Sequence, residues 1–369
     1  MNASYIEPND IRSLDHSLLM LALDDATLSV LFLMAYEEQY PENILIPLLQ
    51  KNNKPIIGGI FPELIFMGER KSKGVLLLPL PFVLNTQRFD LSQTPEDFLK
   101  QLESVQNDSL DPSSTLFVFM DAMSYNKEFF IESLFNFFGS NPTYIGGGAG
   151  CLKFEPFPCI ITNSGIYTNA AVIGWANKKT ALGVAHGWQP VSEPLKVTKA
   201  VKNALIGINW KPAFEVYKEI VEKHSGMQFT ADNFFQIAKS YPLGITKIDA
   251  EMVVRDPFKV TDNILHMVDV INEGEYIVIL HGNMDSLLAG ASKAKEIAFE
   301  KAEDSMDQRS VFCIDCISRV LYMQNDFKKE LEIIGKNVTV TGILTMGEIA
   351  NSEESFLEIY NKTIVLGIW

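Results

Sequence analysis

Apolar residues in the first half of the chain form short runs that alternate with stretches of helical spacing. The runs are bounded by turn residues and predict buried strands at 29–35, 54–59, 74–80 and 115–120, with a further strand that starts at Tyr144 and runs into glycines. Helical spacing predicts helices at 41–51, 94–106 and 126–138. Residues 1–26 are acidic and polar around one short apolar patch, which predicts a peripheral lead-in.

The second half begins with short β-rich runs separated by turns between Cys159 and His186, a pattern typical of a meander, so we expect mixed sheets rather than purely parallel ones. After Val197 the pattern changes, and 212–224 has the apolar stripe of an amphipathic helix. Further strands are expected at 251–255, 276–281 and 310–316, and further helices at 286–302 and 325–334.

These patterns predict an α/β (α+β) protein with mixed β-sheets and helices packed on their outer faces. We expect a lead-in at 1–27, an N-terminal region at 28–190 and a C-terminal region at 191–369. No internal repeat is visible in the sequence.

Composition narrows the class of protein. The 369 residues are 47% hydrophobic and 21% charged, which is typical of a globular protein with a real core. A net charge of −15 argues against nucleic-acid binding, which needs clustered Lys and Arg. Neither a signal peptide nor an apolar run of about 18 residues is visible. Four cysteines do not make a disulfide scaffold, so we expect a cytoplasmic protein without a membrane span.

Three segments in the last quarter of the chain place thiols, a carboxylate and a guanidinium inside apolar sequence. They are 312–319, 341–349 and 360–363. Burying such groups is costly unless they are paired or meet a ligand, so the three segments together predict a site.

In order along the chain, these and other segments resemble the FIST (F-box and intracellular signal transduction) family, with both its N-terminal and C-terminal regions. The resemblance spans roughly residues 28–369 and is carried by 144–150, 185–190, 197–198, 209–217, 253–255, 272–275, 316–319 and 347–349.

The resemblance implies an intracellular sensory module that binds a small ligand, such as an amino acid or another small carboxylate, and reports to a signalling output. Some members resemble haem-binding nitric-oxide sensors, so a haem cofactor is an alternative to our expectation of no cofactor. No kinase, cyclase or receptor segment is visible in the sequence, and we expect none to be fused. The output is therefore expected through a separate partner such as a histidine kinase, cyclase or chemoreceptor, as in two-component signalling.

Arg319 and Glu348 are the strongest candidates for the site. Each is a charged residue in an apolar context, and we expect them to pair. The pair is either a structural ion pair or the lining of a pocket in which Arg319 presents its fork to a ligand carboxylate, and the two roles are compatible.

The remaining candidates are cysteines, glycines and one histidine. Cys313 and Cys316 form a single C-x-x-C, too few ligands for a structural zinc site, so core lining ranks first and ligand contact second. The glycine segment containing Gly147 and Gly148 is followed by prolines rather than a helix, which excludes a dinucleotide-binding loop. The expected ligand-binding residues are Arg319, Cys316, Cys313, Glu348, Gly347, His186, Gly147 and Gly148, with no metal site.

Catalysis is the alternative from another class. An enzyme would use Cys316 or Cys313 as nucleophile with His186 or His281 as base, and the same two histidines are the candidates for a haem ligand. The sequence contains no nucleophile elbow, no metal-binding histidine pair at helical spacing and no phosphate-cradling loop. We therefore expect a non-catalytic protein.

Overall fold

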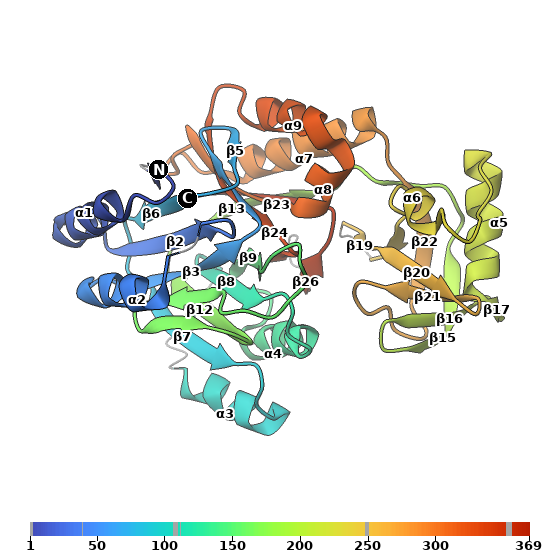
Figure 1. Cartoon of the computed structure of the whole chain (residues 1–369), viewed down its shortest axis with the longest axis horizontal. Coiled ribbons are helices and arrows are strands. Elements are labelled where there is room, and N and C mark those ends of the chain that lie inside the picture. The colour runs from blue at the N-terminus through green and yellow to red at the C-terminus, as the bar shows by residue number, and fades with distance from the viewer. Residues whose placement is uncertain (1–2, 39, 106–109, 111, 248–250, 352–355) are drawn as a thin grey trace.

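The computed structural model describes residues 3–38, 40–105, 110, 112–247, 251–351 and 356–369. Three six-stranded sheets and their helices form the larger part of the molecule, which we call the body, and a fourth sheet with two helices forms a smaller lobe, residues 189–281 (Figure 1). The predicted α/β class with mixed sheets and outer helices is confirmed. Within the described residues, every helix is too short or too polar to cross a bilayer.

Sheet one has the strand order β1-β6-β2-β3-β10-β11. Its strands are β1 (Ser4–Ile6), β6 (Val75–Leu80), β2 (Ser29–Ala35), β3 (Ile56–Phe61), β10 (Ile160–Thr162) and β11 (Gly165–Tyr167). Helix α2 (Glu42–Lys51) connects the parallel pair β2 and β3, while α1 (Ile11–Leu23) buries Leu14 and Leu18. The expected lead-in thus supplies a strand and a helix to the body.

Sheets two and three each combine strands from both halves of the chain. Sheet two consists of β26 (Leu357–Tyr360), β25 (Glu348–Asn351), β9 (Thr143–Ala149), β8 (Thr115–Asp121), β12 (Ala170–Ala176) and β7 (Asn85–Asp90), in that order. Sheet three consists of β13 (Ala181–Ala185), β27 (Ile364–Ile368), β23 (Ser310–Cys316), β24 (Thr339–Thr345), β4 (Glu63–Phe66) and β5 (Glu69–Lys71). The pairs β25–β9, β13–β27 and β24–β4 each join an early strand to a late one, so the two regions interleave in one body.

A glycine marks the one parallel pair at the centre of each of these sheets. A Cβ atom on that glycine would lie less than 2 Å from a backbone oxygen of the neighbouring strand, so no other residue fits. The distances are 1.9 Å for Gly58 opposite Phe32, 1.7 Å for Gly146 opposite Val118 and 1.7 Å for Gly342 opposite Cys313.

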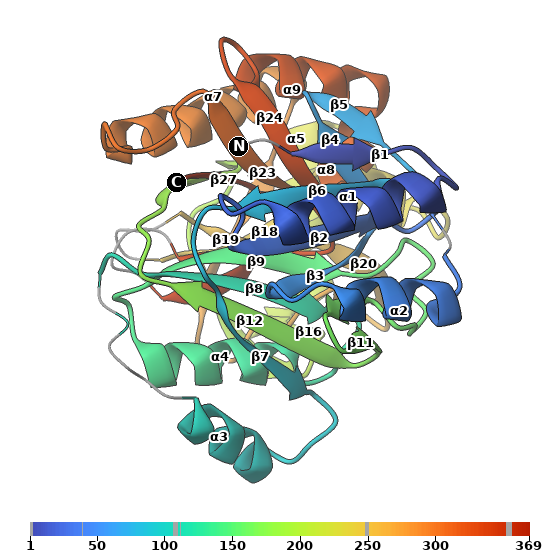
Figure 2. The same cartoon turned by 90° about the vertical axis from the view of Figure 1, so that its left-hand side faces the viewer.

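Helices cover the two outer faces of the stacked sheets. Figure 2 shows α7 (Met284–Lys301) and α9 (Phe327–Ile334) on one side and α3 (Pro95–Ser104) and α4 (Lys127–Phe138) on the opposite side. The largest core combines residues between the sheets of the body with residues of the lobe, and separate cores lie under each helix layer. Of the strands that carry the predicted site, β9, β23, β24 and β25 are interior strands of their sheets, and β13 and β26 are edge strands.

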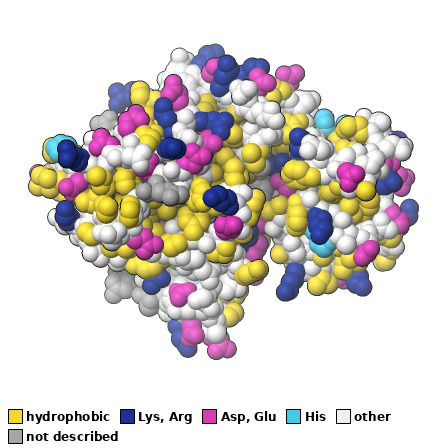
Figure 3. All heavy atoms as spheres, viewed as in Figure 1, with side chains coloured by type: hydrophobic (Ala, Val, Ile, Leu, Met, Phe, Trp, Pro, Cys, Tyr) yellow, Lys and Arg dark blue, Asp and Glu magenta, His cyan; other side chains and the backbone are white. Residues whose placement is uncertain are grey.

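The lobe is an antiparallel sheet ordered β19-β18-β22-β15-β16-β21-β20. Its strands are β14 (Gln189–Pro190), β15 (Leu195–Val201), β16 (Ala204–Ile208), β17 (Lys211–Pro212), β18 (Leu243–Ile245), β19 (Val253–Arg255), β20 (Pro257–Thr261), β21 (Ile264–Met267) and β22 (Tyr276–His281). The predicted amphipathic helix is α5 (Ala213–Ser225), which packs on this sheet together with α6 (Phe234–Ala238). The chain enters the lobe at β14. Figure 3 shows a notch between the lobe and the body.

Candidate functional site

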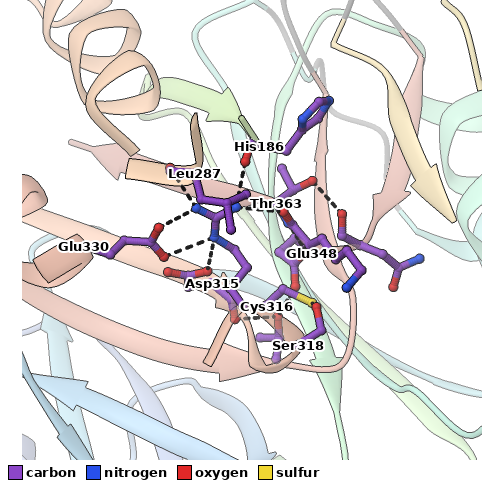
Figure 4. Close-up of polar contacts among 12 residues, drawn as sticks. His186, Leu287, Asp315, Cys316, Ser318, Glu330, Glu348 and Thr363 are labelled. Carbon is purple, nitrogen blue, oxygen red and sulfur yellow. Dashed lines mark hydrogen bonds and ion pairs between the residues drawn. The ribbon is translucent and has the colours of Figure 1, made fainter. Parts of the chain in front are cut away.

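Arg319 is completely buried, and all five of its N–H groups are used within the protein (Figure 4). It lies in α8 (Ile317–Met323), the short helix that follows β23. Its Nε donates to Glu330 Oε1 at 3.0 Å, and Nη2 donates to Glu330 Oε2 and, at 3.0 Å, to the Leu287 carbonyl. Its Nη1 donates to the carbonyls of His186 at 2.6 Å and Lys362 at 3.1 Å. The guanidinium has no donor left for a ligand in this arrangement.

The predicted pairing of Arg319 with Glu348 is therefore wrong, because the partner is Glu330 on α9. A signal for Glu330 was present in the sequence. It shares the buried stripe of a strongly amphipathic helix with Phe327 and Leu331, where a charged residue requires a partner.

A second buried carboxyl group, that of Asp315, lies beside this pair. Its Oδ1 is 3.6 Å from Arg319 Nε, and within the described residues neither oxygen makes a hydrogen bond of normal geometry. Burial, and then the negative charge of Glu330, raise the pKa of Asp315 well above its usual value. A protonated Asp315 leaves one cation and one anion in the cluster, which is electrically balanced.

Glu348 and Cys316 form a separate cluster next to this one. The fully buried Glu348 accepts a hydrogen bond from Thr345 Oγ1 at 2.8 Å and from the Thr363 backbone N–H at 3.3 Å. Burial raises the pKa of Glu348 to about 8, so the acid is mostly neutral at pH 7. Cys316 Sγ lies 2.9 Å from Ser318 Oγ, and burial followed by the charge of Glu348 raises the pKa of its thiol. A thiol in this environment is a poor nucleophile.

Cys313 and Cys316 point to opposite faces of sheet three, because they are an odd number of residues apart on one strand. Cys313 packs in the core under α7 and α9, and burial raises the pKa of its thiol well above the usual value. Within the described residues, no hydrogen bond joins either cysteine to a histidine.

The candidate glycines surround the turn between β24 and Glu348. Gly147 pairs with Glu348, and the Gly148 N–H donates to the Gly347 carbonyl at 2.8 Å. A Cβ at Gly147 would lie 2.5 Å from Thr345 Cγ2, and Gly347 has a φ of 105°, which favours glycine. These glycines therefore permit close packing of β9 against the turn, and the Gly148 N–H is already used.

His186 lies at the end of β13 and is buried, and within the described residues its Nδ1 is hydrogen-bonded while its Nε2 is not. Its Nδ1 accepts from the Trp188 backbone N–H at 2.8 Å, and its Nε2 lies 3.3 Å from Glu251 Oε1. Burial lowers the pKa of His186 to about 4, so the ring is neutral at pH 7. His281 lies in the lobe beside His224 and Tyr241 instead. Across the described part of the chain, no group of three or more His, Cys, Asp or Glu residues could hold a metal ion.

Sequence reasoning overlooked Lys362, although it lies in the segment 360–363 that stood out. This buried lysine occupies the turn between β26 and β27, and its Nζ is 3.2 Å from Asp256 Oδ1 and 4.8 Å from the centre of the Trp188 ring. Trp188 Nε1 is buried and has no hydrogen-bond acceptor among the described residues. A buried donor without an acceptor is costly, so a polar group that reached it would be bound favourably.

Several charged contacts connect the lobe to the body in the same area. Lys127 Nζ is 2.6 Å from Asp269, Lys247 Nζ is 2.5 Å from Glu358, and Lys293 Nζ is 2.8 Å from Glu251. Arg255 adds a hydrogen bond of 2.9 Å to the Ile359 carbonyl. The border between lobe and body is therefore rich in polar contacts.

Comparison with known protein families gives two matches. A family model described as the FIST N domain matches residues 27–211, and one described as the FIST C domain matches residues 213–351. The first match ends at Lys211 in β17 and the second begins at Ala213, the first residue of α5, so both contribute to the lobe. A search of curated proteins finds no match.

Proposed function

Because the chain belongs to the FIST family, whose domains are sensory modules of signal transduction, we propose that it binds a small solute at the border of lobe and body. The solute is an amino acid or another small carboxylate, and a separate signalling protein in the cytoplasm receives the output. The observation that carries this proposal is the buried Lys362 beside the indole N–H of Trp188, which has no acceptor in the described part of the chain.

The chemistry of these two groups favours an anionic ligand. A carboxylate that replaced Asp256 at the Lys362 ammonium would keep the charge balanced and would give Trp188 Nε1 an acceptor. Arg319, the expected anchor, then has a supporting role. It fixes the carbonyls of His186 and Lys362, and thereby the two segments that carry the proposed contacts.

The other expected ligand-binding residues support the turn from its far side. Glu348 accepts from the N–H of Thr363, the residue after Lys362, and Gly147, Gly148 and Gly347 pack around Glu348. Cys316 adjoins the same acid. Movement of the Lys362 turn on binding would therefore reach sheets two and three.

The proposed response is a change in the position of the lobe. Release of Asp256 from Lys362 would remove one of the charged contacts between lobe and body. A ligand shifts the equilibrium between two positions of the lobe only as far as its affinities for the two positions differ. A contact that is present in one position and absent in the other supplies that difference in affinity.

The test is a thermal-shift screen of amino acids and small acids with the wild type, Lys362→Gln and Lys247→Gln. Lys247→Gln is the matched control, because Lys247 also connects lobe and body through a carboxylate. We expect hits that stabilise the wild type and Lys247→Gln but leave Lys362→Gln unchanged. Trp188→Phe keeps the ring and removes the N–H, so it should weaken the response. An equal response in all variants would contradict the proposal.

A further inference from the structure

Trp210 is an exposed aromatic residue on an unfavourable backbone conformation. It lies in the turn between β16 and β17, and its side chain is 81% exposed. Asn209 and Trp210 have φ angles of 49° and 62°, both in the left-handed region, where a bulky residue is a genuine outlier. The fold therefore places an indole in solvent at a position where glycine would cost less.

Hydrogen bonds hold this turn in place. The Trp210 N–H donates to Thr198 Oγ1 at 3.2 Å, and the Asn209 side chain accepts from the Lys196 N–H at 2.9 Å. The Asn209 N–H donates to the Lys196 carbonyl, also at 2.9 Å. A rigid turn that presents an almost fully exposed indole is typical of a binding anchor, because little side-chain freedom is lost when a partner covers the ring.

A groove of about 500 Å³ lies next to the indole. Ile206 and Ile264 supply apolar surface. The charged residues that line the groove are Lys199, Lys211 and one acid, Asp262. Figure 1 places β17 at the far end of the lobe from the body. The groove is thus separate from the proposed ligand site.

We propose that this groove binds an extended segment of another protein that combines a bulky apolar residue with acidic residues. The groove is too open to enclose a small molecule, and its concave shape does not match a flat bilayer. The protein has a net charge of −15, so two lysines on the groove attract an acidic segment that most of the surface repels. The groove would then be the site that contacts the signalling partner, so this proposal rests on the proposed signalling role.

The test selects short random peptides on the immobilised full-length protein and measures their affinities by fluorescence anisotropy. We expect peptides that contain Asp or Glu beside Phe, Leu or Trp. Trp210→Ala should weaken them by about 10-fold or more, as for a hot-spot residue, and Lys199→Gln with Lys211→Gln should abolish the loss of affinity that added salt causes in the wild type. Controls are Tyr125→Ala, a fully exposed aromatic, and Lys329→Gln, a lysine of the body.

Peptides that bind these variants and the wild type equally, or no selected peptides at all, would overturn the proposal. Trp210-dependent binding to vesicles of phosphatidylcholine and phosphatidylglycerol would replace it with a membrane contact. Trp210-dependent self-association in analytical ultracentrifugation would replace it with a dimer interface. Trp210→Ala should keep the thermal-shift response to small solutes. The thermal-shift response of Lys362→Gln tests the ligand proposal, and the peptide affinity of Trp210→Ala tests this one. Failure of either proposal is therefore recognised independently of the other.

Discussion

The buried acid Glu348 gives the clearest quantitative prediction, made with the substitution Glu348→Gln. Glutamine keeps the shape of the side chain and still accepts a hydrogen bond from Thr345, but it does not titrate. Burial raises the pKa of Glu348 from 4.5 to about 8. The comparison of the two proteins therefore isolates the energetic effect of this one ionisation.

The sign follows from proton binding in the two states. Between pH 4.5 and about 8 the folded protein holds a proton on Glu348 that the unfolded chain has released. The free energy of unfolding of the wild type thus falls as pH rises through this window, by at most 1.36 kcal/mol per pH unit and roughly 5 kcal/mol in total. Below pH 4.5 both states are protonated, and the effect disappears. Asp315 acts in the same direction, but it is present in both proteins and cancels.

The assay is urea unfolding, followed by circular dichroism, at intervals from pH 5 to pH 9. We expect the stability of Glu348→Gln relative to the wild type to increase by roughly 2–5 kcal/mol over this range. The matched control is Glu332→Gln on the exposed side of α9, which should give a constant difference. Parallel curves for Glu348→Gln and the wild type would refute the reasoning, since they would mean that Glu348 ionises alike in the folded and unfolded states.

Three further predictions follow from the site. Arg319→Met should lower the free energy of unfolding by about 3–5 kcal/mol in urea titrations, because it leaves Glu330 charged, buried and unpaired; a loss below 1 kcal/mol would contradict this account. Cys313 and Cys316 should resist iodoacetamide at pH 8 in the native protein and react once it is unfolded, because burial raises the pKa of both thiols; mass spectrometry would detect rapid native labelling, the opposite result. Protein produced with added haem should show no Soret band, because His186 is buried and its Nδ1 accepts from the Trp188 backbone N–H; a band lost in His186→Gln would revive the haem alternative.

Local patterns in the sequence predicted the fold class and most elements, because periodicity reports which face of an element is buried. The strand at 310–316 and the helix at 325–334 are examples, observed as β23 and α9. Local patterns do not predict which strands pair with one another. The pairing of β4 with β24 joins residues about 280 positions apart, and no local feature of either strand encodes it.

The site was predicted in part for the same reason. An apolar context identified Arg319 and Glu348 as buried charges, and both are completely buried. Their partners depend on tertiary packing, which brings α9 to Arg319 and leaves Glu348 with hydroxyl and backbone donors. The role of Lys362 depends on Asp256 and Trp188, which lie far from it in the sequence and meet it only at the border of lobe and body.

The glycines at the centres of the three body sheets have a consequence for how the architecture is organised. Sheets one, two and three share one layout, in which a parallel pair linked through helix is flanked on each side by antiparallel strands. The same arrangement of strands thus occurs three times in the body, although its sequence shows no repeat. Superposition of the three sheets on Gly58, Gly146 and Gly342 would align corresponding strands and so display the internal structural repeat.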